Sequence, residues 1–477
     1  MKSNTLLIYP PATQDKQPLF GLPPLGILYI SSYLNKKKIK TLVLDSEIES
    51  FSYNDIKSII IENNIGVIGF SVMTVFLNTA LHISTRLKND FSDIYIVLGG
   101  PHISGTKEET LKINKNIDFL IYGEGEVALY SLIDSLRNNK PLSNVSNLIY
   151  RKDNAIIINE PQHFVNDLDS LPFPELDHII NFKPGLYNVP YSLNRTSSII
   201  TSRGCPYNCN FCSAYITHGH KWRNRSIDNV VEEIKYNYDK YGIRYFVIKD
   251  SLFSKDKEWT HKFCNGILSS RIKVNFRCNT RIDCVDKSLL KRMKECGFDI
   301  INFGIESGDD NILNTINKQL NKDLALKVFD IANKLEIKTH ATFMIGNIGE
   351  TKESLNNTIT YAKEINPFFA RFFPATAYPG TQLYNYSVKN NLVEDKWYLS
   401  DLYKNTVNER YLFPEFNKGT LLFKDFHPNK EARNAFWSFY LRPKIIFRLI
   451  IMMLTNKKYF INILKAGTSL IRYKLLK

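Results

Sequence analysis

Three cysteines within eight positions are the residues of this sequence best suited to chemistry. Cys205, Cys209 and Cys212 have the spacing C-x3-C-x2-C in the segment RGCPYNCNFC. Three thiolates on one loop can each bind one iron of a 4Fe–4S cubane and leave the fourth iron open. The open iron suits a bidentate small molecule, such as the amino and carboxylate groups of methionine. The alternative is a zinc site, for which His218 or His220 could supply a fourth ligand.

The other four cysteines are expected to be core residues. They are 14, 6 and 12 positions apart and share no compact ligand loop, which argues against a second cluster at Cys264, Cys278, Cys284 and Cys296. Seven cysteines in 477 residues are too few for a disulfide scaffold. The first residues, MKSNTLLIYP, predict a short buried strand and lack the pattern of a signal peptide. We therefore expect a cytoplasmic protein.

Residues 1–140 are predicted to form a domain that could position a ligand. Apolar strands alternate there with amphipathic helices, which indicates a doubly wound, Rossmann-like parallel α/β domain. The expected strands are Thr5–Tyr9, Lys40–Leu44, Val67–Ser71, Ile94–Leu98 and Phe119–Tyr122. Such domains bind ligands beyond the carboxyl ends of their strands, where small residues let a flat cofactor approach the backbone. The candidate residues at these ends are Pro10, Ser71, Thr74, Gly99, Gly100, Gly123, Glu124 and Gly125.

The rest of the chain is predicted to contain a linker, a barrel and a C-terminal extension. Prolines break residues 141–195, which we interpret as the linker. Residues 196–390 repeat a strand–helix unit six times, which predicts a partial (β/α)6 barrel of the TIM type. Its expected strands are Ser198–Ser202, Tyr245–Lys249, Val274–Arg277, Ile300–Gly304, Thr339–Ile345 and Phe369–Phe373. Residues 391–477 form the extension, with basic, amphipathic helices.

The cysteine segment and four later segments resemble the radical S-adenosylmethionine superfamily. The later segments follow barrel strands and read KDSLF (249–253), GIESG (304–308), MIGNIGET (344–351) and AYPGT (377–381). The resemblance implies that S-adenosylmethionine is bound by residues of these segments and by Arg281, which could instead form an ordinary surface ion pair. The implied contacts are Phe211 beside the last cysteine, Asp250 at the methionine amino group, Glu306 and Ser307 at the ribose and carboxylate, and Gly346 near the adenine. The family's third segment usually carries proline where this chain has Ile348.

The N-terminal domain resembles the cobalamin-binding domain that is fused to one radical subfamily. The segments that carry this likeness include LPPLG (22–26), GGPH (99–102) and GEGE (123–126). The subfamily includes anaerobic magnesium-protoporphyrin monomethyl ester cyclases and hopanoid methylases. This chain has no Asp-x-His-x-x-Gly motif in the domain, so the resemblance implies cobalamin without a histidine below the cobalt. The alternative is a domain that keeps its fold and no longer binds cobalamin.

The resemblance implies an enzyme with three cofactors: a 4Fe–4S cluster, S-adenosylmethionine and cobalamin. A one-electron reductant such as flavodoxin or ferredoxin would drive cleavage of S-adenosylmethionine to a 5′-deoxyadenosyl radical. We expect methyl transfer to an unactivated carbon of a small-molecule or lipid-like substrate. The alternatives are cobalamin-assisted oxidation or cyclisation of a tetrapyrrole or lipid-like substrate, and tRNA modification. Nucleic acid is not an expected partner, because neither a second cysteine triad nor an RNA-binding appendage is visible. No catalytic residue is assigned.

The basic C-terminal tail favours contact with a membrane surface. The chain has a net charge of +15, and the tail from Arg442 to Lys477 has nine Lys or Arg and no Asp or Glu. The apolar run at 445–454 is interrupted by Arg448 and is shorter than the ~20 residues that a spanning helix needs. We therefore expect a helix lying on the inner, anionic face of the membrane. The alternative is a helical pair that packs on the barrel.

Overall fold

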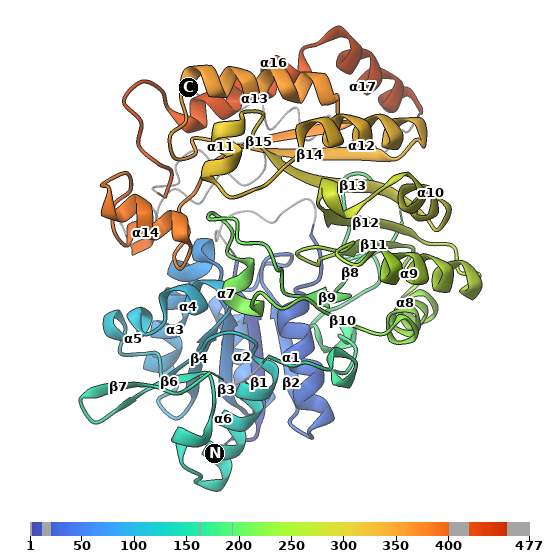
Figure 1. Ribbon diagram of the computed structural model, residues 1–477. Coiled ribbons are helices and arrows are strands. Elements are labelled where there is room, and N and C mark those ends of the chain that lie inside the picture. Colours follow the sequence, from blue (N-terminus) through green and yellow to red (C-terminus); the bar gives the residue numbers. More distant parts are fainter. Residues whose placement is uncertain (1, 12–20, 162–163, 193, 400–418, 456–477) are drawn as a thin grey trace.

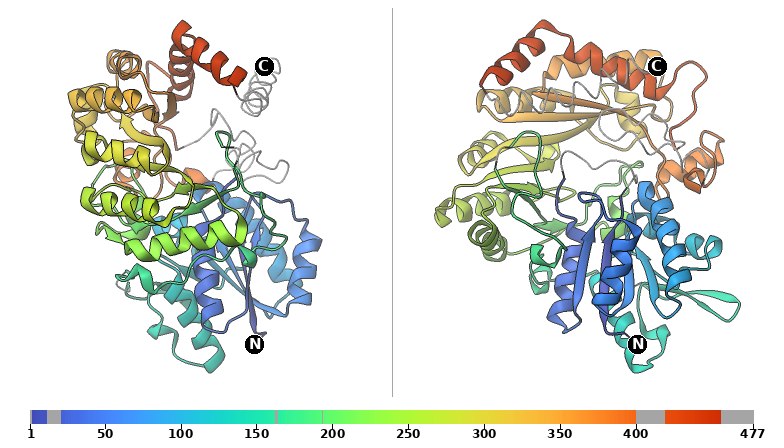
Figure 2. Two further views of the ribbon diagram at one scale, coloured as in Figure 1. Left: turned by 90° about the vertical axis from the view of Figure 1, so that its right-hand side faces the viewer. Right: turned by 180° about the vertical axis from the view of Figure 1, so that it is seen from behind.

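The computed structural model describes residues 2–11, 21–161, 164–192, 194–399 and 419–455. Two sheets dominate the molecule, one from the N-terminal third of the chain and one from the middle and C-terminal parts (Figure 1). The two domains are stacked end to end, and the views in Figure 2 show the same arrangement from the side and from behind.

The N-terminal sheet is doubly wound, as the sequence predicts. Its five parallel strands lie in the order β2-β1-β3-β4-β5, so the chain reverses its direction of winding between β1 and β3. Leu7 packs in one core cluster with α1 and α6, whereas Leu6 packs in another with α2 and α3. Helices therefore cover both faces, as parallel sheets require. The strands are Asn4–Tyr9 (β1), Thr41–Asp45 (β2), Ile65–Ser71 (β3), Tyr95–Gly99 (β4) and Phe119–Ile121 (β5), and the helices are Leu25–Lys36 (α1), Tyr53–Glu62 (α2), Leu77–Asp90 (α3), Pro101–Thr106 (α4), Glu109–Ile113 (α5) and Glu126–Asn138 (α6).

Two further strands extend this sheet within the segment that the prolines predict to be a linker. Strands β6 (Leu148–Lys152) and β7 (Ala155–Ile158) form an antiparallel hairpin, and β6 pairs with β5. The chain then returns across the sheet, where the Ile180 amide donates to the Val43 carbonyl at 2.8 Å. The segment after β7 is therefore packed against the N-terminal domain before it enters the barrel.

The second sheet is the predicted partial barrel. Its six parallel strands run in the order β15-β14-β13-β12-β11-β8, and each of the six predicted strands is present. Helices lie on the outer side of the sheet (Figure 1). The strands are Thr196–Ile199 (β8), Tyr245–Ile248 (β11), Asn275–Thr280 (β12), Phe298–Glu306 (β13), Lys338–Ile345 (β14) and Phe369–Pro374 (β15), and a short ribbon joins Ser202–Arg203 (β9) to Arg223–Asn224 (β10). The helices are Ala214–His218 (α7), Ile227–Tyr241 (α8), Lys257–Ser270 (α9), Lys287–Glu295 (α10), Asp310–Thr315 (α11), Lys322–Lys334 (α12), Lys352–Ile365 (α13) and Gln382–Lys389 (α14).

Two C-terminal helices, α16 (Pro428–Tyr440) and α17 (Pro443–Thr455), follow the barrel. Helix α16 packs on β15, where the Tyr440 hydroxyl bonds both the amide and the carbonyl of Ala370. Helix α17 is anchored by Arg448, which donates to the Pro367 carbonyl at 3.0 Å, but Phe447 and Leu454 remain 65% and 80% exposed. No helix among the described residues is both long and apolar enough to cross a membrane. The tail beyond residue 455 lies outside the described residues.

Candidate functional site

The cysteine loop begins directly after β9 and is held in a tight turn. Gly204 has φ +87°, and a Cβ at this position would lie 2.1 Å from the Lys221 carbonyl oxygen. Only glycine fits that conformation and that space. The Cys205 amide then donates to the Gly219 carbonyl at 3.3 Å, which ties the start of the loop to the end of α7. The backbone thus fixes the first cysteine of the triad.

The three thiols share one loop but do not surround a single ion. Cys209 is buried, Cys205 and Cys212 are partly exposed, and the Cys212 amide donates to the Cys209 carbonyl at 3.1 Å. Among the described residues, no group of three His, Cys, Asp or Glu side chains is placed to hold one metal ion. A cubane binds each thiolate through a different iron, so a cluster does not require such a group. Burial raises the pKa of Cys209, and the charges of Lys318 and Arg281 oppose that effect.

Asp250, at the end of β11, braces the approach to the cysteine loop. Its buried carboxylate accepts hydrogen bonds from the Thr201 amide at 2.7 Å and from the hydroxyls of Thr201 and Ser202, both at 2.6 Å. These bonds join the end of β11 to the connection between β8 and β9. Contact between Asp250 and S-adenosylmethionine remains a prediction.

Arg281 has one donor left over for an anionic group. Its guanidinium lies 3.7 Å from the Tyr207 ring centroid, and its Nε donates to Asp283 Oδ1 at 2.9 Å. Its Nη1 is buried and has no hydrogen-bond partner in the structure. An unsatisfied buried donor is costly, so a carboxylate at this point would satisfy it. The donor set beside Cys209 therefore fits the carboxylate of S-adenosylmethionine.

At the end of β13, Glu306 has a left-handed backbone conformation and its carboxylate pairs with a lysine. Glu306 has φ +70° and lies 3.1 Å from Lys318 Nζ, and both side chains are less than 10% exposed. Ser307 is buried and its hydroxyl contacts Thr358 Oγ1 at 2.9 Å. Phe211 packs against residues that follow β13 and β15. The sequence identifies Glu306 but not its partner, which lies 12 positions later.

The end of β14 forms a turn that leaves polar atoms unsatisfied. Gly346 has φ +88°, and its amide and that of Asn347 both donate to Glu350 Oε2. Burial raises the pKa of Glu350 to about 7, although the two amide hydrogen bonds oppose the rise. The second oxygen of Glu350 and Oδ1 of Asn347 are buried and have no hydrogen-bond partner. These atoms suit a polar ligand such as a nucleobase.

A cavity of about 360 Å³ lies where the two domains meet. From the N-terminal domain it is lined by Ser71, Gly99, Gly100, Gly123, Glu124 and Gly125, all of which the sequence predicts. Thr74 is not among the lining residues and contacts His102 Nδ1 at 3.2 Å, and Pro10 follows Tyr9, which does line the cavity. Gly100 has φ +98°, and a Cβ there would lie 2.8 Å from the Val72 amide nitrogen. Since this volume is typical of small-molecule sites, the cavity fits part of a bound cofactor.

The barrel contributes residues to the cavity that the sequence analysis did not assign to the cobalamin site. Ile200, Arg203, Thr217, His218 and Lys249 line it from the ends of β8, β9, α7 and β11. The strand-end rule gives a signal for Lys249, because this residue directly follows β11. Among the described lining residues His218 is the one histidine, and it belongs to the barrel domain.

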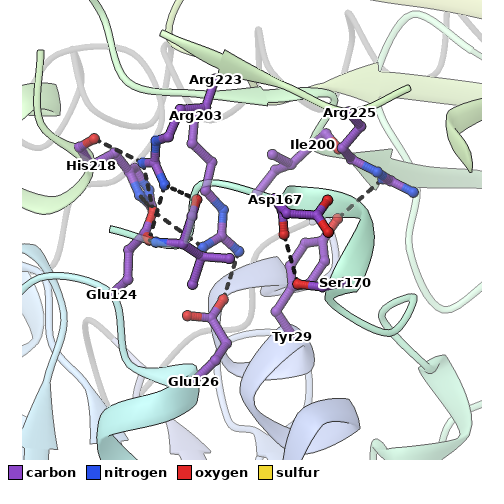
Figure 3. Close-up of polar contacts among 11 residues, drawn as sticks. Tyr29, Glu124, Glu126, Asp167, Ser170, Ile200, Arg203, His218, Arg223 and Arg225 are labelled. Carbon is purple, nitrogen blue, oxygen red and sulfur yellow. Dashed lines mark hydrogen bonds and ion pairs between the residues drawn. The ribbon is translucent and has the colours of Figure 1, made fainter. Parts of the chain in front are cut away.

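Five buried or half-buried side chains form an ion network between the domains (Figure 3). Arg203 Nη2 lies 2.6 Å from Glu126 Oε1, and Arg203 Nη1 lies 3.3 Å from Glu124 Oε1. Arg223 and His218 also contact Glu124 Oε1, at 2.8 and 3.1 Å. Burial alone would raise the pKa of Glu124, but hydrogen bonds from His218 and Arg223 and the charge of Arg203 hold it well below its usual value. Glu124 and Glu126 thus bind the strands that flank the cysteine loop.

The structure also shows where three of the four remaining cysteines lie, and where the two histidines considered as zinc ligands lie. Cys264, Cys278 and Cys296 lie in the hydrophobic core with α9, β12 and α10. His218 is engaged with Glu124, and the His220 ring stacks on Tyr215 with centroids 4.8 Å apart.

Two family models match the chain, one for each predicted domain. Residues 199–362 match the radical SAM superfamily and residues 19–133 match the B12 binding domain. These matches confirm the predicted fold class. They also confirm the three predicted cofactors, which are a 4Fe–4S cluster, S-adenosylmethionine and cobalamin.

Relatives match over most of the chain at low identity. A protein of Pyrococcus horikoshii described as an uncharacterized methyltransferase is 28% identical, over 93% of this chain and 94% of that protein. The cytidylyl-2-hydroxyethylphosphonate methyltransferase of Streptomyces wedmorensis is 26% identical, over 85% and 84%. The radical S-adenosylmethionine methyltransferase TsrM of Kitasatospora setae has the same fold, with a TM-score of 0.68, 15% identity and coverage of 82% and 75%. Anaerobic magnesium-protoporphyrin IX monomethyl ester cyclases and a hopanoid C-3 methylase are also relatives. The chain therefore belongs to the group of radical SAM enzymes that carry an N-terminal B12-binding domain.

Proposed function

We propose that this enzyme transfers a methyl group from S-adenosylmethionine to an unactivated carbon of a small molecule. The observation that carries the proposal is the cavity between the domains, which is lined by the strand ends of the N-terminal sheet and by Arg203 and Lys249 of the barrel. A cofactor held there would lie between the N-terminal domain and the barrel domain. The bound cofactors would supply a methyl group and a carbon-centred radical, and the protein would supply their placement.

The chain's own residues then have positioning roles. The Gly204 turn and Asp250 hold the cysteine loop, and the free Nη1 of Arg281 would orient the carboxylate of S-adenosylmethionine. The small residues at the cavity wall, Gly99 and Gly100, would let a planar group approach the backbone. Two relatives that are matched over 94% and 84% of their own length are methyltransferases by name, whereas a cyclase is matched over 66%, which favours methyl transfer over cyclisation.

The test is a turnover with S-adenosylmethionine labelled in its methyl group. Anaerobically reconstituted protein would be given a reductant and a small-molecule extract of the source cells, with the Cys205, Cys209 and Cys212 to Ala triple variant as control. We expect label in one extract component, with one S-adenosylhomocysteine and one 5′-deoxyadenosine for each product. Formation of 5′-deoxyadenosine with an unlabelled product would contradict methyl transfer and support oxidation or cyclisation.

The proposal includes a one-electron reductant and contact with an anionic membrane. A flavodoxin or ferredoxin would donate the electron. Helix α17 exposes Ile446, Phe447, Ile450, Ile451 and Leu454, an apolar surface suited to the interface of a bilayer. Peripheral attachment on the cytoplasmic face would give the enzyme access to a lipid-like substrate.

A further inference from the structure

The inner face of the barrel carries three cations whose charges have little compensation. Residues alternate between the two faces of a strand, and Phe276 and Cys278 of β12 pack outward with the helices. Arg277 between them therefore points inward, and the same alternation turns Arg371 of β15 inward, since Ala370 and Phe372 are in the outer core. Lys249 follows Ile248 of that core and lines the interdomain cavity. We call Lys249, Arg277 and Arg371 the lumen cations.

Arg277 makes its hydrogen bonds to neutral partners. One nitrogen donates to the Tyr191 hydroxyl, and Nη2 lies 3.2 Å from His340 Nδ1. Because arginine can only donate, Nδ1 accepts, and a neutral imidazole carries its proton on Nε2. Burial and then the charges of Arg277 and Arg371 lower the pKa of His340 to about 3, so the ring adds no charge at neutral pH. The guanidinium charge is left without a counter-ion in either partner.

The side chains of the other two lumen cations form no hydrogen bond or ion pair within the described residues, and both lie within electrostatic reach of Arg277. The Arg371 guanidinium lies 6.0 Å from the Phe373 ring centroid. Burial lowers the pKa of both groups, and the nearby Arg277 charge lowers it further. Both residues are nevertheless exposed to solvent, so an anion from solution can reach them.

Among the described residues, no carboxylate forms an ion pair with this cluster. Asp299 of β13 is close enough for the Arg277 charge to lower its pKa, but its Oδ1 accepts a hydrogen bond from the Tyr245 hydroxyl at 2.8 Å. Asp250 adjoins Lys249 in sequence but turns toward Thr201 and Ser202. A surplus of cations is ordinary on the outside of a chain with net charge +15, but gathering three cations on the inner face of one sheet is unfavourable unless an anion joins them.

We propose that the lumen cations bind an anionic group, a phosphoryl or carboxylate, of the enzyme's substrate. This inference rests on the proposed function, because that function makes the barrel interior the place where the substrate lies. Arg371 presents a guanidinium fork, which matches the oxygens of such groups in pairs, and Arg277 adds a second positive charge beside it. Lys249, at the edge of the cavity, would hold the anion near the junction of the two domains. Arg281, close to the cysteine loop, is separate and serves the carboxylate of S-adenosylmethionine.

The test uses inorganic phosphate as the probe and holoprotein with all three cofactors bound. Broadening of the phosphorus resonance of phosphate, titrated with protein, gives a dissociation constant, and acetate is then added as a competitor. The primary variant is Arg371→Gln, because Arg371 makes no hydrogen bond that the fold would lose. Arg371→Lys restores the charge, and Lys327→Gln, an exposed lysine on α12, is the matched control.

We expect saturable binding at one site that Arg371→Gln weakens about tenfold or more, and that Arg371→Lys largely restores. The control should bind phosphate like the unaltered protein. Absence of saturable binding, or equal affinity in Arg371→Gln, would overturn the proposal. Binding of S-adenosylmethionine and cobalamin is measured in the same variants, and a comparable loss there would assign the cations to a cofactor and also overturn it. The phosphate titration needs no turnover, so its result can be interpreted even if the methyl-transfer test fails.

Discussion

Replacing Glu126 by Gln should weaken the attachment of the cysteine loop to the N-terminal domain. Glu126 and Arg203 have side chains only 4% exposed, and their closest atoms are 2.6 Å apart. Removing one partner of a buried pair costs about 3–5 kcal/mol, since the other charge stays buried without compensation. Gln keeps an acceptor oxygen, and Arg203 keeps Glu124 at 3.3 Å, so the lower end applies. We therefore expect a loss of about 3 kcal/mol in the free energy of unfolding.

The assay is urea denaturation of the cofactor-free chain under anaerobic, reducing conditions. The matched control is Glu108→Gln, which breaks the exposed pair between Glu108 and Lys112, 3.0 Å apart, and should cost below about 1 kcal/mol. Linear extrapolation gives each free energy, and the transition to compare is the one in which the two domains separate. If Glu126→Gln lost no more stability than the control, the network would be a surface feature and the reasoning would be refuted. Iron content of the reconstituted variant should fall as well, because Arg203 immediately precedes the loop.

Three further predictions test other parts of the structure. Gly204→Ala should lose most of its iron, because a Cβ there would lie 2.1 Å from a carbonyl oxygen, whereas Gly185→Ala, with φ +97° and open space, should keep it. Phe447→Glu should weaken binding to anionic liposomes, and Leu422→Glu, similarly exposed at 68%, should not. The pKa of Glu350 is raised from 4.5 to about 7 by burial, so the unfolded chain loses this proton first as pH rises. The free energy of unfolding should therefore decrease between about pH 4.5 and pH 7. Urea denaturation of Glu350→Gln should show no such decrease.

The fold could be predicted because the sequence pattern identifies most of its strands. The barrel strands carry buried residues in every unit, and a helix follows each of the first five strands before the next one. A parallel sheet covered by helices is the common fold for such an alternation. The hairpin β6–β7 was not predicted, because β7 is largely exposed and the prolines around it indicate irregular backbone. Six of the eight strand-end residues predicted in the N-terminal domain line the cavity, as expected when parallel strands end at one edge.

The contacts between the domains could not be predicted, for a physical reason. Arg203 and Glu126 are 77 positions apart. A buried ion pair between distant residues produces no hydrophobic periodicity by which either segment could be recognised in the sequence. The pattern GEGE suggests a ligand contact for Glu124, but its carboxylate faces two arginines and a histidine of the barrel. Lys249 follows a predicted strand, but its place in the interdomain cavity depends on how the two domains meet.

One short segment therefore links the two predicted cofactor sites. Gly123 and Gly125 form part of the cavity wall, and the glutamates beside them hold Arg203, which is two residues before Cys205. A rotation of one domain against the other would break buried ion pairs, which is costly, whereas a surface loop would yield at little cost. The separation between cavity and cysteine loop is thus set by side chains that also line the cavity. Methyl transfer between two bound groups depends on such a fixed separation, because a displacement of about 1 Å can slow a reaction about a hundredfold.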